Sequence, residues 1–265
     1  MYKFDRDISL RQLGEKNFDA NISPDWSVNN NPDGGYLMAL LANAVLQHAD
    51  MQWITIFTAA FLSRCVPGPA TATVDSLGKS TRFERWTVEL SQKQQKKIHA
   101  VCTLTDRNKG ADQVCHYEAA PPDLPKQQEC VEFPALPGYT IFQQMEVLLD
   151  PACAGWLTTG KLVARSEHRG WIRFRDGRPF DMLSALLVVD SFPPPILASQ
   201  GMVAWVPTLE MSVNVRELPA TEWLKCVFRS RFLGSGIVEE DGTVWDENGT
   251  LVAISRQVAQ FRKTG

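Results

Sequence analysis

The chain has 265 residues, of which 44% are hydrophobic and 22% charged, and its formal net charge is −3. This composition is typical of a folded globular protein and excludes disorder as the dominant state, because the apolar content is high and the net charge is small. The longest apolar stretches, residues 36–42 and 182–189, are too short to cross a bilayer, which takes about 20 residues. We expect no membrane span, and the small charge gives no reason to expect a nucleic-acid partner.

The first half of the chain predicts a buried helix followed by strands. Residues 29–35 read Asn-Asn-Asn-Pro-Asp-Gly-Gly, and Asn31 or Asp33 can cap the helix that follows at 36–46. That helix is apolar almost all round, which indicates burial on most sides. Alternation of apolar and polar residues then predicts strands at 54–63, 71–77, 85–92 and 98–105.

A proline-rich segment follows this half. Residues 121–137 hold five prolines (Pro121, Pro122, Pro125, Pro134 and Pro137), a density that stops regular helices and central strands. We interpret this segment as a linker on the surface. The predicted organisation is an N-terminal unit at 1–119, a linker at 120–139 and a C-terminal unit at 140–265.

The second half repeats the order of the first. An apolar helix is predicted at 182–189, after a strand at 171–174, and three consecutive prolines at 193–195 stop it. Strands are predicted at 208–215, 224–233 and 251–261, with a hairpin connection at 241–249 between the last two. Each half is therefore predicted to wrap an antiparallel run of strands around one buried helix.

Short motifs in a fixed order carry a family resemblance. They are Pro32-Asp33-Gly34-Gly35-Tyr36-Leu37, Phe61-Leu62, Pro67-Gly68, Leu77-Gly78-Lys79-Ser80, Trp171-Ile172-Arg173, Asp190, Thr208-Leu209-Glu210, and Leu251-Val252-Ala253 with Gln257. With them the chain resembles the double-hotdog acyl-CoA thioesterases of the thioesterase II type. The resemblance implies an α+β fold of two tandem hotdog units, and a hydrolase of lipid metabolism that uses no metal and no cofactor. It also implies a cytoplasmic homodimer with acyl-CoA as its small-molecule substrate.

The resemblance places the family's catalytic residues at Asp190, Thr208 and Gln257, where they would hold the water that attacks the thioester. From the residues alone, Asp190 ends an apolar helix, so it lies either in a site or at a solvated helix terminus. Gln257 alternates with small apolar residues, so it either needs buried hydrogen-bond partners or faces solvent on an edge strand. Thr208 alternates with Glu210, Ser212 and Asn214, which favours a solvated side.

The internal duplication predicts one site in each chain. Matched by eye, the first-half counterparts of Asp190, Thr208 and Gln257 are about Asn43, Ile56 and Leu104, none of which can act as a base or orient water. The first half can instead supply Gly34 and Gly35, whose N–H groups at a helix N-terminus would polarise the thioester carbonyl. Tight packing or a turn is the alternative explanation for these glycines.

Two other functions stay open at this stage: a non-catalytic acyl-thioester-binding protein, and an enzyme of the enoyl-CoA hydratase type. The hydratase needs an Asp/His pair, and none of His48, His99, His116 and His168 stands where it suggests one. Residues 93–97 form a basic turn that either meets coenzyme A phosphates or is a solvated hairpin tip. Trp86 and Trp205 are candidates for an acyl tunnel, although core packing is the default explanation for aromatic residues. The six cysteines, Cys115 among them, form no C-x-x-C pair, which suits reduced thiols in the cytosol.

Overall fold

The structure is a computed structural model that describes residues 1–107 and 116–264. Cys115 lies outside the described residues. The first half contains α1 (Lys3–Asp7), β1 (Arg11–Gln12), β2 (Asn17–Ile22), β3 (Ser27–Val28), β4 (Asn31–Pro32), α2 (Gly34–Leu46), β5 (Trp53–Phe61), β6 (Gly68–Lys79), β7 (Phe83–Gln92) and β8 (Gln95–Thr105).

The second half follows the same plan with extra short helices. It contains η1 (Gln127–Glu129), β9 (Val131–Glu132), η2 (Thr140–Gln143), β10 (Met145–Leu149), α3 (Gly155–Thr158), β11 (Ser166–Phe174), α4 (Met182–Val188), α5 (Ile196–Gln200), β12 (Ala204–Trp205), β13 (Thr208–Val215), β14 (Leu224–Ser230), β15 (Leu233–Gly234), β16 (Ile237–Asp246), β17 (Leu251–Gln260) and β18 (Arg262–Lys263).

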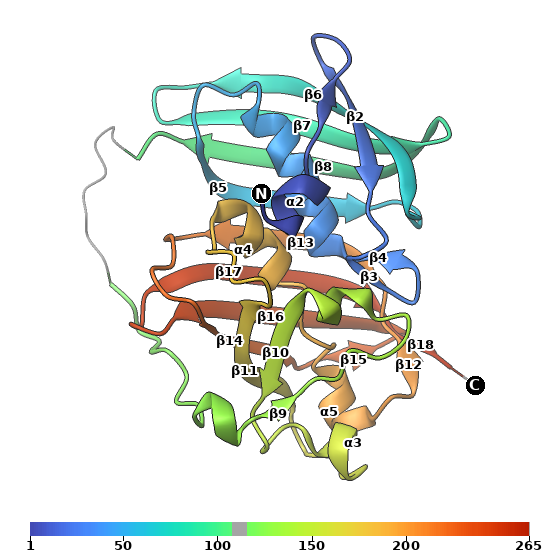
Figure 1. The fold of residues 1–265 in the computed structure, drawn as a ribbon, viewed down its shortest axis with the longest axis vertical. Coiled ribbons are helices and arrows are strands. Elements are labelled where there is room, and N and C mark those ends of the chain that lie inside the picture. Colours follow the sequence, from blue (N-terminus) through green and yellow to red (C-terminus); the bar gives the residue numbers. More distant parts are fainter. Residues whose placement is uncertain (108–115, 265) are drawn as a thin grey trace.

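One antiparallel sheet joins the two halves. Within the described residues it has 14 strands in the order β1-β2-β6-β7-β8-β5-β13-β17-β16-β14-β11-β10-β9, with β15 paired to β16. Figure 1 shows how the sheet runs from one end of the molecule to the other past α2 and α4. The halves meet where β5 pairs with β13, and at the middle of this seam the Thr58 and Ser212 hydroxyls lie 2.8 Å apart in a hydrogen bond.

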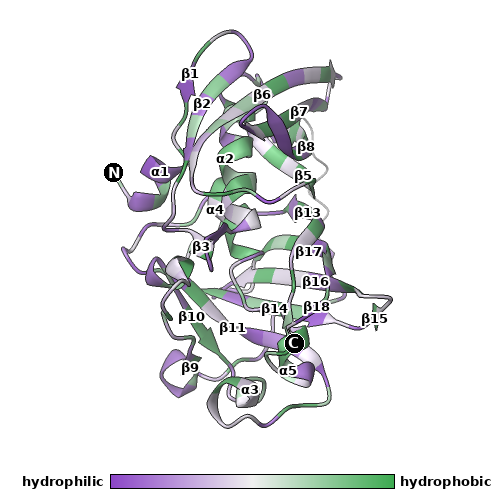
Figure 2. Cartoon of the chain, turned by 90° about the vertical axis from the view of Figure 1, so that its right-hand side faces the viewer, coloured by the Kyte–Doolittle hydropathy of each residue, from purple (hydrophilic) through white to green (hydrophobic). Residues whose placement is uncertain are grey.

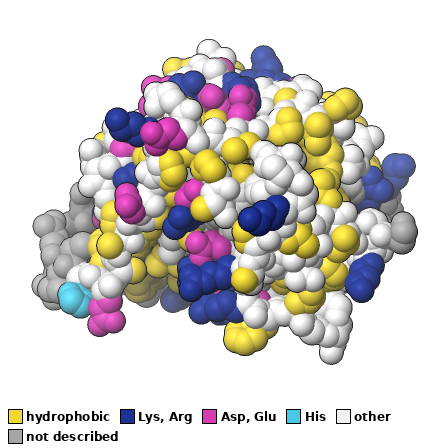
Figure 3. All heavy atoms as spheres, turned by 90° about the horizontal axis from the view of Figure 1, so that it is seen from below, with side chains coloured by type: hydrophobic (Ala, Val, Ile, Leu, Met, Phe, Trp, Pro, Cys, Tyr) yellow, Lys and Arg dark blue, Asp and Glu magenta, His cyan; other side chains and the backbone are white. Residues whose placement is uncertain are grey.

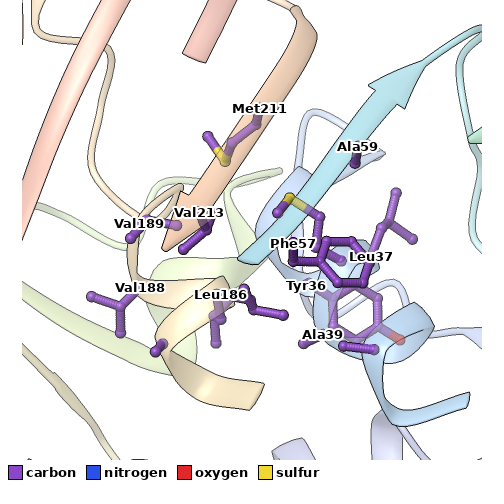
Figure 4. Close-up of a cluster of buried hydrophobic side chains, with 14 of the residues drawn as sticks. Tyr36, Leu37, Ala39, Phe57, Ala59, Leu186, Val188, Val189, Met211 and Val213 are labelled. Carbon is purple, nitrogen blue, oxygen red and sulfur yellow. The ribbon is translucent and has the colours of Figure 1, made fainter. Parts of the chain in front are cut away.

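The core lies between the two central helices and the two seam strands. Figure 4 shows side chains of α2, α4, β5 and β13 that meet there, among them Leu37, Phe57, Leu186 and Met211. Figure 2 shows α2 as an almost continuously hydrophobic helix, and its residues from Gly35 to Ala42 are all buried. Burial all round is the outcome expected of an apolar helix enclosed by a sheet on one side and another helix on the other.

The predicted hairpin connection at 241–249 begins too early: β16 continues through Asp246, and the turn lies between Asp246 and Leu251. Gly242 belongs to the strand. A Cβ at this position would clash with the Ser255 hydroxyl and would lie 2.6 Å from the Phe228 ring. Gly242 therefore permits close packing inside a sheet, and sequence patterns take such a glycine for a turn residue. The sequence analysis predicts no strand for β16, and it also predicts none of β2, β10, α1, α5 and several shorter elements.

The predicted strand at 208–215 agrees with β13 in both bounds. Inside the segment predicted as a linker, β9 pairs with β10 as the last strand of the sheet, and the Pro125 carbonyl accepts a hydrogen bond from Trp171 Nε1 at 2.9 Å. An edge strand is a position that tolerates neighbouring prolines. The unit boundaries at 119 and 140 stay a prediction.

The surface in Figure 3 mixes charged side chains of both signs with scattered apolar ones on the face seen from below. In the described part of the chain, every helix falls short of the length and apolarity that a membrane span requires. The turn at Lys93 and Gln94 has positive φ angles of 50° and 63° and is exposed, as in a tight two-residue hairpin turn. Lys96 pairs with Glu89 on the neighbouring strand at 2.7 Å.

Candidate active site

A cavity of about 570 Å³ lies where the N-terminus of α2 meets the second half of the chain. Its wall includes the Asp190, Thr208 and Gln257 side chains and Gly34, so four of the five predicted site residues line one space. The volume falls in the range of small-molecule binding sites. The rest of the wall is largely apolar and aromatic, with Phe61, Phe133, Tyr139, Phe142, Trp156, Phe192 and Trp205 among its members.

Asp190 follows the C-cap of α4 and turns its carboxylate toward the start of α2. Its Oδ2 accepts a hydrogen bond from the Gly35 backbone N–H at 3.0 Å. Burial in the cavity wall raises the pKa of Asp190 to about 6, although the N–H groups of Gly35 and Gly34 act in the opposite direction. A carboxyl group with this pKa accepts a proton more readily than an ordinary aspartate, and it is still ionised at neutral pH.

Gln257 and Thr208 form the second part of the site. Gln257 is 7% exposed on β17, and its Nε2 donates a hydrogen bond to the Thr208 Oγ1 on β13. The Gln257 Oε1 and the Thr208 hydroxyl proton remain available for another hydrogen bond each. The need of Gln257 for a buried partner is therefore met by Thr208.

Thr208 does not lie on the solvated side that its alternation with Glu210 favours. The register of β13 against β17 shifts by one residue between Thr208 and Glu210, so Thr208 stands opposite Ala259. Ala259 and Gln257 are both buried on one face of β17, and cross-strand partners point to the same side of a sheet. The β-bulge therefore turns Thr208 into the cavity, a local effect that sequence alternation cannot show.

Close contacts leave no room for a side chain at Gly34 or Gly35. A Cβ on Gly35 would clash with the Leu186 carbonyl oxygen of α4 and lie 2.9 Å from the Leu187 Cα. A Cβ on Gly34 would lie 2.7 Å from Asp190 Oδ2. The two glycines thus let α2 approach α4 and leave room for the Asp190 carboxylate. The Gly35 N–H, predicted to face a substrate carbonyl, faces Asp190 in this structure.

The first-half counterparts predicted for Thr208 and Gln257 are wrong by two residues. In β5 the register shift falls between Ile54 and Ile56, so Ile54 corresponds to Thr208. By the same match Cys102 corresponds to Gln257. Both are fully buried, whereas Ile56 is 39% exposed. Asn43, the predicted counterpart of Asp190, donates a hydrogen bond to the Ile8 carbonyl at 2.9 Å.

Two acidic residues of the cavity wall were missed as site residues. Asp33 was recognised only as a helix cap, and the structure confirms that role: its Oδ1 accepts from the Tyr36 N–H at 2.9 Å. Glu240 lies opposite Gln257 in the β16–β17 pairing and faces the same cavity. Burial raises the pKa of both carboxyl groups well above the ordinary value. Glu240 lies between the predicted strand at 224–233 and the predicted hairpin connection at 241–249, so alternation along a strand assigns it to no face.

The four histidines lie outside the cavity wall, although His168 contacts two wall residues, Pro193 and Trp156. Buried His168 bonds the Pro193 carbonyl through Nδ1 at 2.8 Å. Among residues 1–107 and 116–264, no three His, Cys, Asp or Glu side chains are grouped so that they could hold a metal ion. Trp205 lines the cavity, whereas Trp86 packs against His48 elsewhere, and an acyl tunnel stays a prediction.

A single antiparallel sheet wrapped round two central helices, with a cavity at their junction, defines a double hotdog in the α+β class. Residues 22–105 match the acyl-CoA thioesterase N-terminal domain, and residues 118–261 match the acyl-CoA thioesterase C-terminal domain. The chain therefore belongs to the acyl-CoA thioesterase family. It is 26% identical over 266 residues to an uncharacterized protein of Mycobacterium tuberculosis, covering 91% of this chain and 90% of that protein.

Solved structures with the same fold cover almost the whole chain. A protein named as a thioesterase II from Thermobifida fusca superimposes with a TM-score of 0.90 at 23% identity, covering 99% of this chain and 98% of that one. A hot dog protein from Alicyclobacillus acidocaldarius gives a TM-score of 0.90 at 19% identity over 100% of both chains. An acyl-CoA thioesterase II from Mycobacterium marinum gives 0.77 at 17% identity over 99% of both chains. At these identities the likeness shows the fold.

Proposed function

We propose that the protein hydrolyses acyl-CoA thioesters to the free acid and coenzyme A, with a water molecule as the direct nucleophile. The observation that carries this proposal is the arrangement of Asp190, Thr208 and Gln257 in the wall of one cavity of about 570 Å³. A carboxylate, a hydroxyl and an amide together offer the acceptors and the donor that a bound water needs. Family membership supports the same reaction class.

The side-chain atoms of Asp190, Thr208 and Gln257 that can still form a hydrogen bond suggest the role of each residue in catalysis. Asp190 Oδ2 is held by Gly35, so its Oδ1 is the oxygen proposed to accept a proton from water. Gln257 Oε1 would accept the second water proton, and the Thr208 hydroxyl would donate to the water oxygen. One lone pair of that oxygen is then left to attack the thioester carbonyl. The carbon–sulfur bond breaks as the intermediate collapses, and the thiolate takes the proton held by Asp190.

Gly34 and Gly35 are the proposed donors to the thioester carbonyl. Their N–H groups lie at the N-terminus of a 13-residue helix, which favours the negative charge that develops on the carbonyl oxygen. Because the Gly35 N–H bonds Asp190 in this structure, a bound thioester has to share or displace that hydrogen bond. The cytoplasmic location and the homodimer stay predictions.

The decisive experiment measures thiol release from acyl-CoA substrates of graded chain length. We expect turnover by the wild-type protein and a loss of about 10³-fold in kcat for Asp190→Asn, since the amide cannot accept the proton. Asp19→Asn, in an exposed ion pair with Arg11, is the matched control and should keep full activity. Consumption of an enoyl-CoA without thiol release would identify a hydratase. Tight acyl-CoA binding without turnover would identify a binding protein.

A further inference from the structure

Two carboxyl groups share the N-terminus of α2. Asp33 is the N-cap residue of α2, and its Oδ1 lies 2.9 Å from the Tyr36 nitrogen. Asp190 reaches the same turn from α4, with Oδ2 3.0 Å from the Gly35 nitrogen. The two carboxyl groups also lie within hydrogen-bond reach of each other, and both line the cavity. The end of α2 therefore holds two acids in contact.

Two carboxyl groups in contact can form a hydrogen bond only when one of them carries a proton. Burial and the charge of Asp190 raise the pKa of Asp33, and the Asp33 contact acts on Asp190 in the opposite direction. The two acids therefore share one proton, and the negative charge that remains lies beside the α2 N–H groups, which stabilise it. The other charged groups in the cavity wall are Glu240 on β16, Arg64 after β5 and Arg262 on β18.

We propose that Asp33 is a positioning residue for the hydrolysis: as a neutral acid it donates a hydrogen bond to Asp190 and holds the Asp190 carboxylate toward the cavity. This inference rests on the proposed function, in which Asp190 receives the proton of water. The working form of the site is then the pair with a single shared proton. The site is impaired when both acids are protonated and again when both are ionised.

Asp33→Asn tests this role without disturbing the helix. Asparagine caps helices as well as aspartate does. Its Oδ1 can accept from the Tyr36 N–H while its amide N–H donates to Asp190, so it copies a permanently protonated Asp33. Asp33→Ala removes both bonds. The matched control is Asp181→Asn: Asp181 caps α4 by accepting from the Ser184 N–H at 2.8 Å, but its charged partner is Arg178.

The first measurement is the pH dependence of kcat. We expect a profile with an acid and an alkaline limb for the wild type, and for Asp181→Asn. Asp33→Asn should keep kcat within about threefold at the optimum and lose the alkaline limb or move it up by more than one pH unit. Asp33→Ala should lose at least tenfold in kcat across the range. An Asp33→Asn profile that coincides with the wild type, or a folded Asp33→Asn protein without activity, overturns the proposal.

The second measurement does not depend on turnover. Carbon-13 NMR of labelled aspartate carboxyls should show two coupled titrations with widely separated midpoints in the wild type and in Asp181→Asn, and one of them should vanish in Asp33→Asn. Coupled titrations in a protein that releases no thiol would refute the proposed function and leave the proton-sharing pair in place. Thiol release with independent titrations near the ordinary pKa would overturn the pair alone.

Discussion

The N-termini of α2 and α4 are the corresponding points of the two halves, and both begin with an aspartate cap. Asp33 accepts from the N–H three residues on, and so does Asp181. The charged groups beside the two caps have opposite sign. Asp33 meets the carboxyl group of Asp190, whereas Asp181 lies 2.5 Å from the guanidinium of buried Arg178. A cation therefore neutralises the Asp181 carboxylate, whereas the Asp33 carboxyl group shares a proton with Asp190.

The N-terminal segment of the chain accounts for much of this difference. Asp5 also pairs with Arg178, at 2.8 Å from its Nε, and the guanidinium lies over the Phe4 ring at 5.0 Å. The Ile8 carbonyl, directly after α1, accepts a hydrogen bond from Asn43 of α2. A short segment outside the repeated plan thus distinguishes the surroundings of two helix ends that the plan itself makes alike.

Removal of Arg178 is the change with the largest expected effect on this comparison. Arg178→Ala leaves Asp5 and Asp181 without their cation and opens space beside Phe4, at a cost of about 2–4 kcal/mol in the free energy of unfolding, since the carboxylates are partly exposed. Denaturant unfolding would measure this loss. Arg11→Ala, which breaks the exposed pair with Asp19, should cost less than about 1 kcal/mol. Equal costs for the two variants would contradict a structural role for the Arg178 cluster.

A methyl group at the N-terminus of α2 should reduce catalytic activity more than it reduces the free energy of unfolding. Gly34→Ala places a Cβ 2.7 Å from Asp190 Oδ2 and 2.9 Å from the Phe61 ring, so these side chains must move. We expect kcat to fall about 10²-fold, because small displacements of a catalytic group carry losses of this size. Gly14→Ala, with open space around it, is the control and should leave activity unchanged. Full activity of Gly34→Ala would show that the position of Asp190 at α2 is unimportant.

The third prediction concerns stability and how it depends on pH. The pKa of Asp190 is raised to about 6 from an ordinary value of 3.8, so the folded state binds this proton more tightly than the unfolded state. Its contribution to stability is complete below pH 4 and is lost as the pH rises to 6. Asp190→Asn should therefore match the wild type at pH 4 and exceed it by about 3 kcal/mol at pH 8, because each pKa unit of the shift corresponds to about 1.4 kcal/mol. A difference that does not change with pH would contradict the raised pKa.

Much of this architecture could be predicted from hydrophobic patterns. The two central helices are apolar on almost every side, and the strand at Thr208–Val215 alternates regularly, so their positions agree with the sequence prediction. The resemblance of short motifs identified the fold, and Asp190, Thr208 and Gln257 are brought to one cavity. Their catalytic roles stay a prediction.

The details that sequence could not give depend on local irregularities and on contacts across the chain. A bulge reversed the side on which Thr208 lies, and the equivalent shift in β5 moved its counterpart from Ile56 to Ile54. The contact of Asp33 with Asp190 joins residues 157 positions apart in the sequence. No periodic pattern encodes such a contact, because it depends on how closely α2 crosses α4.

The pairing of β5 with β13 joins the two halves of the molecule into one continuous sheet. Five residue pairs, from Glu210 with Ala60 to Asn214 with Ile56, continue the backbone ladder from one half into the other. Neither half can melt without exposing a central strand of its neighbour to water. The chain should therefore unfold in one cooperative transition, and two fragments made by cleavage of the connection near residue 120 should remain associated and be able to complement each other.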